Sequence, residues 1–339
     1  MSSQSAVRVQ VWDGWRGVAI ALVLCGHFFD FESLHEDRMG VDVFFGLSGM
    51  LMSIILFENR MSLRDFYIRR LSRIFPALLF LVLVSFAFSA AMSHDIHLAE
   101  LPASLLFVRT YFPQSPHIWE TQTSTAHLWS LNVEEHAYMV MSAMTLLMVS
   151  VVRSAVVLLC IGALSIAFAT FYYMKAGPGG FEILSINTES ASSFIFLSAG
   201  YGLIKRRHGW SLPATAFLAL IVIAPLCYAY ATPLWLRFTL APIVLAVAVN
   251  HLDDLQGLFK LLLSNPVLCW LGTCSYSIYL WQQIFFEWAW ALPGGLFTGL
   301  VLSVAAGVGS FYLLENPCRR LINARWSAKP VFHPQAATA

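Results

Sequence analysis

The amino-acid sequence predicts an all-α, polytopic integral membrane protein with about ten transmembrane helices and both termini in the cytoplasm. Of the 339 residues, 58% are hydrophobic and only 12% are charged, whereas an ordinary soluble domain has roughly 25% charged residues. The mean hydropathy of +0.69 leaves too little polar surface to cover one soluble core of this size. The apolar residues fall into about ten runs of roughly 17–22 residues, each long enough to cross a bilayer as a helix.

The predicted spans follow one another through the whole chain. They are Gly17–Phe31, Val41–Phe57, Ile74–Met92, Glu135–Val151, Ala155–Met174, Ala191–Ile204, Leu212–Ala231, Leu234–Asn250, Pro266–Trp288 and Pro293–Leu314. The sixth run is the shortest and contains several serines. No soluble domain or internal repeat interrupts the series, so residues 1–325 are predicted to form one transmembrane domain. Residues 326–339 are predicted to be a disordered cytoplasmic tail.

The distribution of lysine and arginine gives the predicted orientation. With ten spans and a cytoplasmic amino terminus, 16 of the 20 basic residues lie on the cytoplasmic side, in agreement with the positive-inside rule. The four on the outer side are Arg38, Arg109, Lys175 and Arg237. One span more or fewer would mix the two groups. The polar first ten residues, with no small-residue cleavage site after the apolar run, argue against a cleaved signal peptide.

The first predicted span carries an arginine and a histidine on an otherwise apolar stretch. Arg16 and His27 are 11 residues apart, which places them on one helix face, about 16 Å apart along the axis. An imidazole has an ordinary pKa near 6.5, which suits proton transfer at neutral pH. Ionisable groups inside a membrane protein usually face a polar cavity and mark a functional site. The alternative is a structural histidine that packs against a backbone carbonyl.

The cytoplasmic link 58–76 carries a cluster of arginines before the third span. Arg70 and Arg73 are three residues apart on a predicted helix and therefore face one way. Two guanidinium groups at the mouth of a membrane domain make a good clamp for phosphates, which indicates a phosphorylated cytosolic donor. The simpler interpretation is that the cluster only determines topology.

The long outer loop 93–130 leads into a polar segment, HLWSLNVEEHAYM at 127–139. Glu134 and Glu135 lie at the entrance to a span, where acidic residues are either interfacial or face a functional cavity. Trp129 is either an anchor at the membrane interface or part of the same site. These alternatives stay open on the residues alone.

Taken together, these segments resemble the membrane-bound acyltransferase 3 family, O-acyltransferases that modify cell-surface glycans and other acceptors. The matching segments are DGWRGVAIALVLCGH at 13–27, GVDVFFGLSG at 40–49, RRLSRIFPA at 69–77, HLWSLNVEE at 127–135, LGTCSYSIYLWQ at 271–282 and ENPCRR at 315–320. They occur in the family's order and span almost the whole chain. The family usually has histidine after the YLW segment, where this chain has Gln282. That departure bears on a secondary role of the position.

The resemblance implies a membrane enzyme of the bacterial cytoplasmic membrane. It would transfer an acyl group, most commonly acetyl from acetyl-CoA, from a cytosolic acyl-CoA to a hydroxyl of a carbohydrate or lipid-linked glycan. Neither a metal nor a nucleic acid is expected as a partner.

The resemblance also implies roles for single residues. His27 would be the general base toward the acceptor hydroxyl or a transient acyl carrier, and Glu134 or Glu135 would orient it. The other implied site residues are Arg16, Arg70 and Arg73 for the CoA phosphates, and Ser48, Trp129 and Asn132 for the substrates.

The sequence also allows a transport function and a metal site as hypotheses. A transporter or flippase could use a buried arginine and histidine as a substrate or proton path; Pro225 and Pro242 interrupt predicted spans, but no inverted repeat is evident. His94 and His97 have the spacing of half a metal site, but without a third ligand we expect a solvated outer surface.

Overall fold

The computed structural model describes residues 3–29, 33–92, 96–113, 118, 123–147 and 150–326, with side chains from residue 10 onward. Within these ranges the chain is helical and has no β-strand, apart from one isolated bridge between Leu34 and Ala229. The predicted tail falls, after Trp326, outside the described residues, as does His94.

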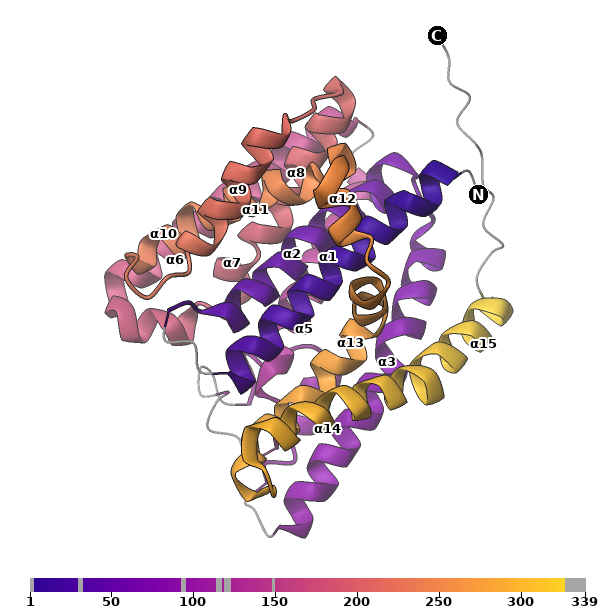
Figure 1. The fold of residues 1–339 in the computed structure, drawn as a ribbon, viewed down its shortest axis with the longest axis vertical. Coiled ribbons are helices and arrows are strands. Elements are labelled where there is room, and N and C mark those ends of the chain that lie inside the picture. Colours follow the sequence, from indigo (N-terminus) through magenta and orange to yellow (C-terminus); the bar gives the residue numbers. More distant parts are fainter. Residues whose placement is uncertain are drawn as a thin grey trace.

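The α-helices follow the order of the predicted runs (Figure 1). They are α1 (Ser3–Phe28), α2 (Glu36–Ser53), α3 (Leu63–Ala91), α4 (Glu100–Leu105), α5 (Trp129–Leu147), α6 (Val151–Leu184), α7 (Thr188–Ala191), α8 (Ser193–His208), α9 (Ala214–Leu226), α10 (Leu234–Thr239), α11 (Ala241–Asn250), α12 (Gly257–Leu263), α13 (Pro266–Glu287), α14 (Gly295–Ser310) and α15 (Asn316–Trp326). Short π or 3₁₀ segments adjoin them: η1 (Ile54–Glu58), η3 (Ala126–Leu128), η4 (Leu252–Asp254), η5 (Ala289–Ala291) and η6 (Phe311–Glu315).

Each of the ten predicted runs coincides with a helix or with two consecutive helices. Among the described residues, four continuous helical segments are long and apolar enough to cross a membrane: 36–58, 63–91, 151–184 and 295–326. The pair α12 and α13, bent by 49°, makes a fifth if it is one span. The protein is therefore built as an integral membrane protein. Ten crossings and cytoplasmic termini stay predictions.

Helix α6 is longer than the predicted span because it continues through a kink. Gly177 has a φ of +68°, a left-handed conformation that glycine adopts readily, and Pro178 follows it. Proline lacks the backbone N–H that a helix interior needs, so the helix bends here rather than running straight. The span predicted from apolar composition alone ends earlier, at Met174.

Helices α1 and α2 occupy the centre of the fold (Figure 1). Helix α1 packs against α13 and α2, and α2 packs against α8. Glycines permit the closest of these crossings, as is usual where membrane helices meet. A Cβ at Gly17 would lie 2.8 Å from the carbonyl carbon of Leu268, and one at Gly272 would lie 2.7 Å from that of Asp13. These contacts bring Arg16 beside α13.

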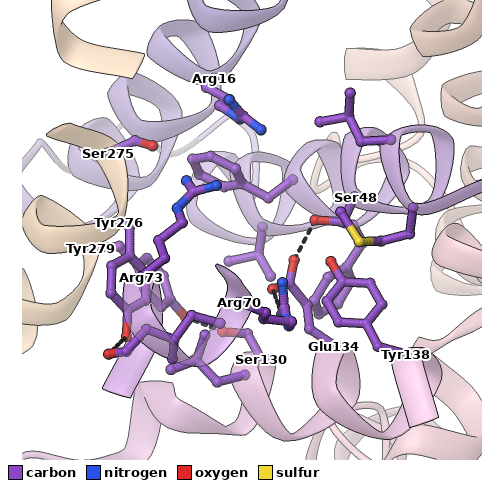
Figure 2. Close-up of a pocket in the computed structure, with 17 residues that line it drawn as sticks. Arg16, Ser48, Arg70, Arg73, Ser130, Glu134, Tyr138, Ser275, Tyr276 and Tyr279 are labelled. Atoms are coloured by element: carbon purple, nitrogen blue, oxygen red, sulfur yellow. Dashed lines mark hydrogen bonds and ion pairs between the residues drawn. The ribbon is translucent and has the colours of Figure 1, made fainter. Parts of the chain in front are cut away.

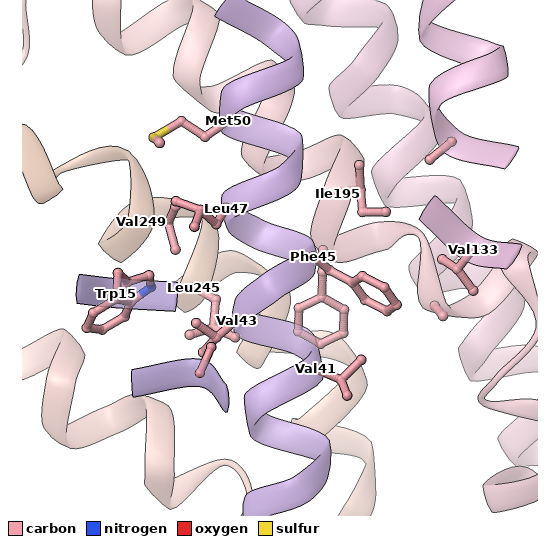
Figure 3. Packing of buried hydrophobic residues seen from close by; sticks show 14 of the residues in the cluster. Trp15, Val41, Val43, Phe45, Leu47, Met50, Val133, Ile195, Leu245 and Val249 are labelled. Atoms are coloured by element: carbon pink, nitrogen blue, oxygen red, sulfur yellow. The ribbon is translucent and has the colours of Figure 1, made fainter. Parts of the chain in front are cut away.

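Helix α2 is surrounded by apolar side chains from other helices (Figure 3). Phe45, Leu47 and Met50 are all at most 2% exposed, and Ile195 and Leu245 belong to the same cluster. Because so many apolar atoms surround it, α2 is held mainly by dispersion contacts. A polar side chain in this apolar surrounding has to face a cavity or a partner.

Three of the four basic residues predicted on the outer side are held in ion pairs. Arg38 lies 3.2 Å from Asp42, and Arg237 lies 2.5 Å from Glu182. Arg109, in the loop before α5, is fully buried and lies 3.1 Å from Glu100. A buried cation without such a partner would be costly.

Candidate active site

The arginines expected to bind the donor surround one cavity of about 100 Å³ (Figure 2). Helices α1, α2, α3, α5 and α13 contribute its walls. The polar lining residues are Arg16, Ser48, Arg70, Arg73, Ser130, Glu134, Tyr138, Ser275, Tyr276 and Tyr279. We call this space the arginine cavity. Arg70 and Arg73 line it together because a spacing of three residues keeps them on one face of α3.

Arg70 is fully engaged inside this cavity. Its Nε donates to Glu135 Oε1 at 2.6 Å, and its Nη2 donates to Glu134 Oε2 at 3.3 Å. Its guanidinium carbon lies 3.7 Å from the centre of the Tyr138 ring. Ser48 Oγ donates to Glu134 Oε1 at 2.5 Å. The two carboxylates offset the charge of Arg70 and fix its orientation.

The other two arginines are less constrained. Arg16 Nη1 lies 2.9 Å from Asp13 Oδ1. Arg73 makes no hydrogen bond or ion pair to the described part of the chain, although its charge interacts with those of Arg16, Arg319 and Glu315. Like charges held close together gain from an anion that binds between them. Arg73 is therefore the arginine of this cavity best placed to meet a phosphate.

His27 lines a second cavity of about 280 Å³, which we call the histidine cavity. Its polar and aromatic lining residues are His27, His35, Asp37, Arg38, His127, Trp129, Glu182, Ser185, Arg237, Tyr279, Gln283 and Phe286. Val41 and Tyr279 line both cavities. The Tyr279 hydroxyl donates to the backbone oxygen of His127 at 2.8 Å and lies 2.7 Å from Ser130 Oγ. A fixed tyrosine thus stands between the two cavities.

The ring of His27 lies with its centre 4.8 Å from that of Phe286. Its Nδ1 is buried and makes no hydrogen bond to the described residues. The amide of Gln282, which is fully buried, interacts with this ring. The departure from the family pattern at Gln282 therefore falls directly beside His27.

The carboxylates expected to orient His27 lie elsewhere. Glu134 and Glu135 both bind Arg70 in the arginine cavity. The anionic side chain that interacts with His27 is Asp37, which lines the histidine cavity. The sequence shows two carboxylates at the start of a span. Only the folded structure shows that Arg70 is the cation with which they pair.

The three residues expected to contact substrate lie at three different places in the structure. Ser48 lines the arginine cavity and Trp129 the histidine cavity, where the Arg38 guanidinium lies 4.7 Å from the indole ring centre. Asn132 is fully buried and forms a hydrogen bond of 2.7 Å with the hydroxyl of Thr110, and it lines neither of these cavities. Its observed contact holds the outer loop against α5.

His127 is a site residue that the sequence argument passed over. It is 3% exposed, lines the histidine cavity, and neither ring nitrogen has a hydrogen-bond partner among the described residues. Burial, with a smaller effect of His27, lowers the pKa of His127 to about 3, so the ring is neutral at physiological pH. Its position two residues before Trp129, in the same polar segment, was the available signal.

No group of three or more histidine, cysteine or acidic side chains within the described ranges is arranged to hold a metal ion. The cavities instead offer guanidinium groups on one side of Tyr279 and imidazoles with an unpaired carboxylate on the other.

Several curated bacterial proteins are similar to this chain. It is 26% identical to "Putative peptidoglycan O-acetyltransferase YrhL" of Bacillus subtilis (strain 168), over 80% of this chain and 47% of that protein. It is 23% identical to a protein named "Putative O-acetyltransferase" in Staphylococcus aureus (strain COL), over 95% of this chain and 59% of that protein. "Putative membrane-bound transacylase BcsY" of Komagataeibacter xylinus is 28% identical, over 90% of this chain and 81% of that protein.

The chain spans about half the length of the first two of these relatives. No solved structure matches it. Residues 9–314 match the family model described as an acyltransferase domain, acyltransferase 3. Since this match covers most of the sequence, the chain belongs to the acyltransferase 3 family.

Proposed function

We propose that the protein is a membrane O-acyltransferase that moves an acyl group, acetyl in the first instance, from acyl-CoA to a hydroxyl of a carbohydrate acceptor. The observation that carries this proposal is the pair of adjoining cavities, one lined by arginines and the other by His27, which meet at Val41 and Tyr279. A two-substrate transfer needs separate sites whose reacting ends come within bonding distance.

The arginine cavity suits the phosphates of CoA. Among the three arginines of this cavity, Arg73 is the one without an ion pair to the described chain, and Arg16 lies on helix α1. Guanidinium groups bind phosphate oxygens through paired, charge-assisted hydrogen bonds. Glu134 and Glu135 have a different role in this proposal: they hold Arg70 in one orientation at the wall of the cavity.

The distance along α1 between the arginine cavity and His27 suits an extended donor. Arg16 and His27 are about 16 Å apart along the helix, so a donor held at its phosphates by Arg16 can extend its thioester toward His27. In the predicted topology the arginine cavity opens to the cytoplasm, where acyl-CoA is made. The histidine cavity then faces the outer side, where envelope or exported glycans are found.

His27 performs the proton transfer in this proposal. As a neutral imidazole it accepts the proton of the acceptor hydroxyl while the hydroxyl oxygen bonds to the thioester carbonyl carbon. The carbon–sulfur bond then breaks, and the leaving thiolate takes up the proton from the imidazolium. In the other route the imidazole nitrogen attacks the carbonyl first and the CoA thiolate leaves; the hydroxyl oxygen then takes the acyl group from the imidazole, and the hydroxyl proton passes to the thiolate.

The histidine cavity has the character of a sugar site. Trp129 and Phe286 supply flat apolar surfaces, and charged groups from α2, α6 and α10 supply hydrogen-bond partners for hydroxyls. Small-molecule sites combine apolar walls with a few polar groups in this way. We propose a lipid-linked or newly exported glycan as the acceptor, because the predicted outer loops are short, the longest being 93–130, so the acceptor has to approach the membrane surface.

The test is acyl transfer from radiolabelled acetyl-CoA in membranes that contain the protein, with a glycan fraction from the same envelope. His27→Ala and Arg73→Gln are compared with the wild type at equal amounts of folded protein. Arg153→Gln is the control, because Arg153 is exposed and lines neither cavity. Loss of transfer in the first two variants supports the proposal. Transfer that persists at full rate in His27→Ala refutes the mechanism, and wild-type membranes without transfer refute the function and favour a transporter.

A further inference from the structure

The histidine cavity contains one carboxylate whose charge no cation of the described chain offsets. Arg38 pairs with Asp42 at 3.2 Å, and Arg237 pairs with Glu182 at 2.5 Å. Asp37 lines the same cavity and makes no ion pair or hydrogen bond within the described ranges. Asp37 is half-buried, so its carboxylate can act on a neighbouring group of the cavity.

The backbone holds Asp37 beside His27. Asp37 lies in the first turn of α2, and Gly26 precedes His27 near the end of α1. A Cβ at Gly26 would lie 2.8 Å from the Cβ of Asp37 and 3.0 Å from its Cα, closer than packed side chains come. Only glycine at position 26 allows this approach, which brings the start of α2 against the end of α1 where His27 projects.

We propose that Asp37 is the carboxylate partner of His27, and that its negative charge stabilises the imidazolium that forms when the acceptor proton is taken up. This inference rests on the proposed acyl transfer. A carboxylate in this role lowers the energy of the charged form of a catalytic histidine without touching substrate. The role belongs to Asp37 and not to Glu134 or Glu135, because both glutamates bind Arg70.

The other groups that face His27 do not compete for this role. His127 belongs to η3 and is neutral at physiological pH. Gln282, on α13, is uncharged and bonds to Gln283 Oε1 at 3.4 Å. His35 packs against Tyr230, with ring centres 4.1 Å apart. The charges of Arg38 and of the pair Arg237 and Glu182 are offset by their own partners.

A purely structural alternative is that Asp37 stabilises α2, since acidic residues in the first turn favour a helix. Glu36 gives the matched control, because it lies in the same turn and does not line the cavity. Glu36→Gln makes the same change of charge one residue away. Any effect on α2 alone would appear in both variants.

The experiment measures kcat and both KM values for acyl transfer in the full-length protein, for the wild type, Asp37→Asn, Asp37→Glu and Glu36→Gln, per amount of folded protein by size-exclusion chromatography. We expect Asp37→Asn to lower kcat about 100-fold with KM values within about threefold, since general-base catalysis contributes roughly 10²–10⁴-fold. Asp37→Glu should recover part of the loss, and Glu36→Gln should keep wild-type kcat. Asp37→Ser replaces Asp37→Asn if the latter does not fold.

Three results would overturn the inference. If kcat of Asp37→Asn stays within threefold of the wild-type value, Asp37 does not assist His27 in the reaction. An equal fall in Glu36→Gln assigns the effect to the end of α2. A raised acceptor KM at unchanged kcat assigns Asp37 to acceptor binding. Wild-type protein without transfer refutes the proposed function, and the inference with it, so the two failures are distinguishable.

Discussion

The pairing of Arg70 with Glu135 makes a prediction that separates two roles for the glutamate. The side chains are 12% and 8% exposed, and the nearest atoms are 2.6 Å apart. In Glu135→Gln the charge is lost while the shape is kept, so Arg70 faces Glu134 alone at 3.3 Å. If the role of Glu135 is to hold Arg70, Glu135→Gln lowers the free energy of unfolding, because the buried guanidinium is then left with one carboxylate partner.

The size of this loss follows from the geometry. With an effective dielectric constant of 20, two unit charges at this distance attract by about 6 kcal/mol. Desolvation cancels much of that attraction, and removing one partner of a buried pair usually costs roughly 3–5 kcal/mol. Because Glu134 and the amide oxygen of the new glutamine still contact Arg70, we expect about 2–3 kcal/mol. That corresponds to a fall in Tm of roughly 5 °C for a domain of this size.

Thermal unfolding in a mild detergent measures the effect. Glu182→Gln is the comparison, because Glu182 also pairs with an arginine at 2.5 Å but is itself 50% exposed; water reaches this pair, so its loss should cost less than the loss of the Glu135 pair even though Arg237 is buried. A double-mutant cycle with Arg70→Met should give a coupling energy of about 2 kcal/mol, and a cycle with His27→Ala should give nearly none. Equal losses in the two glutamine variants, or strong coupling of Glu135 to His27, would refute the reasoning.

Three further predictions concern the cavities. Arg73→Gln should raise the KM for acyl-CoA about tenfold, the loss of one charge-assisted contact, and an unchanged KM would count against phosphate binding there. Tyr279→Ala should join the cavities and increase acyl-CoA hydrolysis without acceptor, while Tyr279→Phe, which keeps the ring, should not; equal leakage in both would contradict the barrier. Because burial lowers the pKa of His127 to about 3, unfolded protein takes up a proton below about pH 6.5 that the folded state does not. Stability should therefore fall with pH from 6.5 to 4.5 by up to about 1.4 kcal/mol per unit, and melting curves of His127→Gln should lack that part of the slope; equal slopes would be the contrary result.

Local periodicity was enough to predict several features. Arg70 and Arg73 line one cavity because residues three apart share a helix face. Arg16 and His27 lie on α1 as expected, but they line different cavities. The same periodicity predicts a shared face and an axial separation of about 16 Å. Only the fold shows that Tyr279 stands between them.

Contacts between distant segments could not be predicted from one sequence. The approach of Asp37 to His27 depends on Gly26, which in the sequence is simply one small residue in an apolar run. The outer loop before α5 contains a buried pair, Arg109 with Glu100, where hydropathy indicated only a polar connection. Such pairs form after folding brings the loop back against the helices, so their spacing in sequence carries no signal.

The balance of charge gives the two cavities complementary properties. In the arginine cavity Asp13 offsets Arg16, and two glutamates offset Arg70. Arg73 forms no ion pair of its own in the described chain, although its charge interacts with that of Glu315.

In the histidine cavity the cations are offset in the same way, and Asp37 is the charge left over. Both Arg73 and Asp37 are half-buried side chains, so a bound substrate can reach them. A cation without an ion pair suits an anionic donor, and a carboxylate without an ion pair beside an imidazole suits the removal of a proton. The charges of these two side chains therefore match the two halves of an acyl transfer, with Tyr279 at the boundary between them.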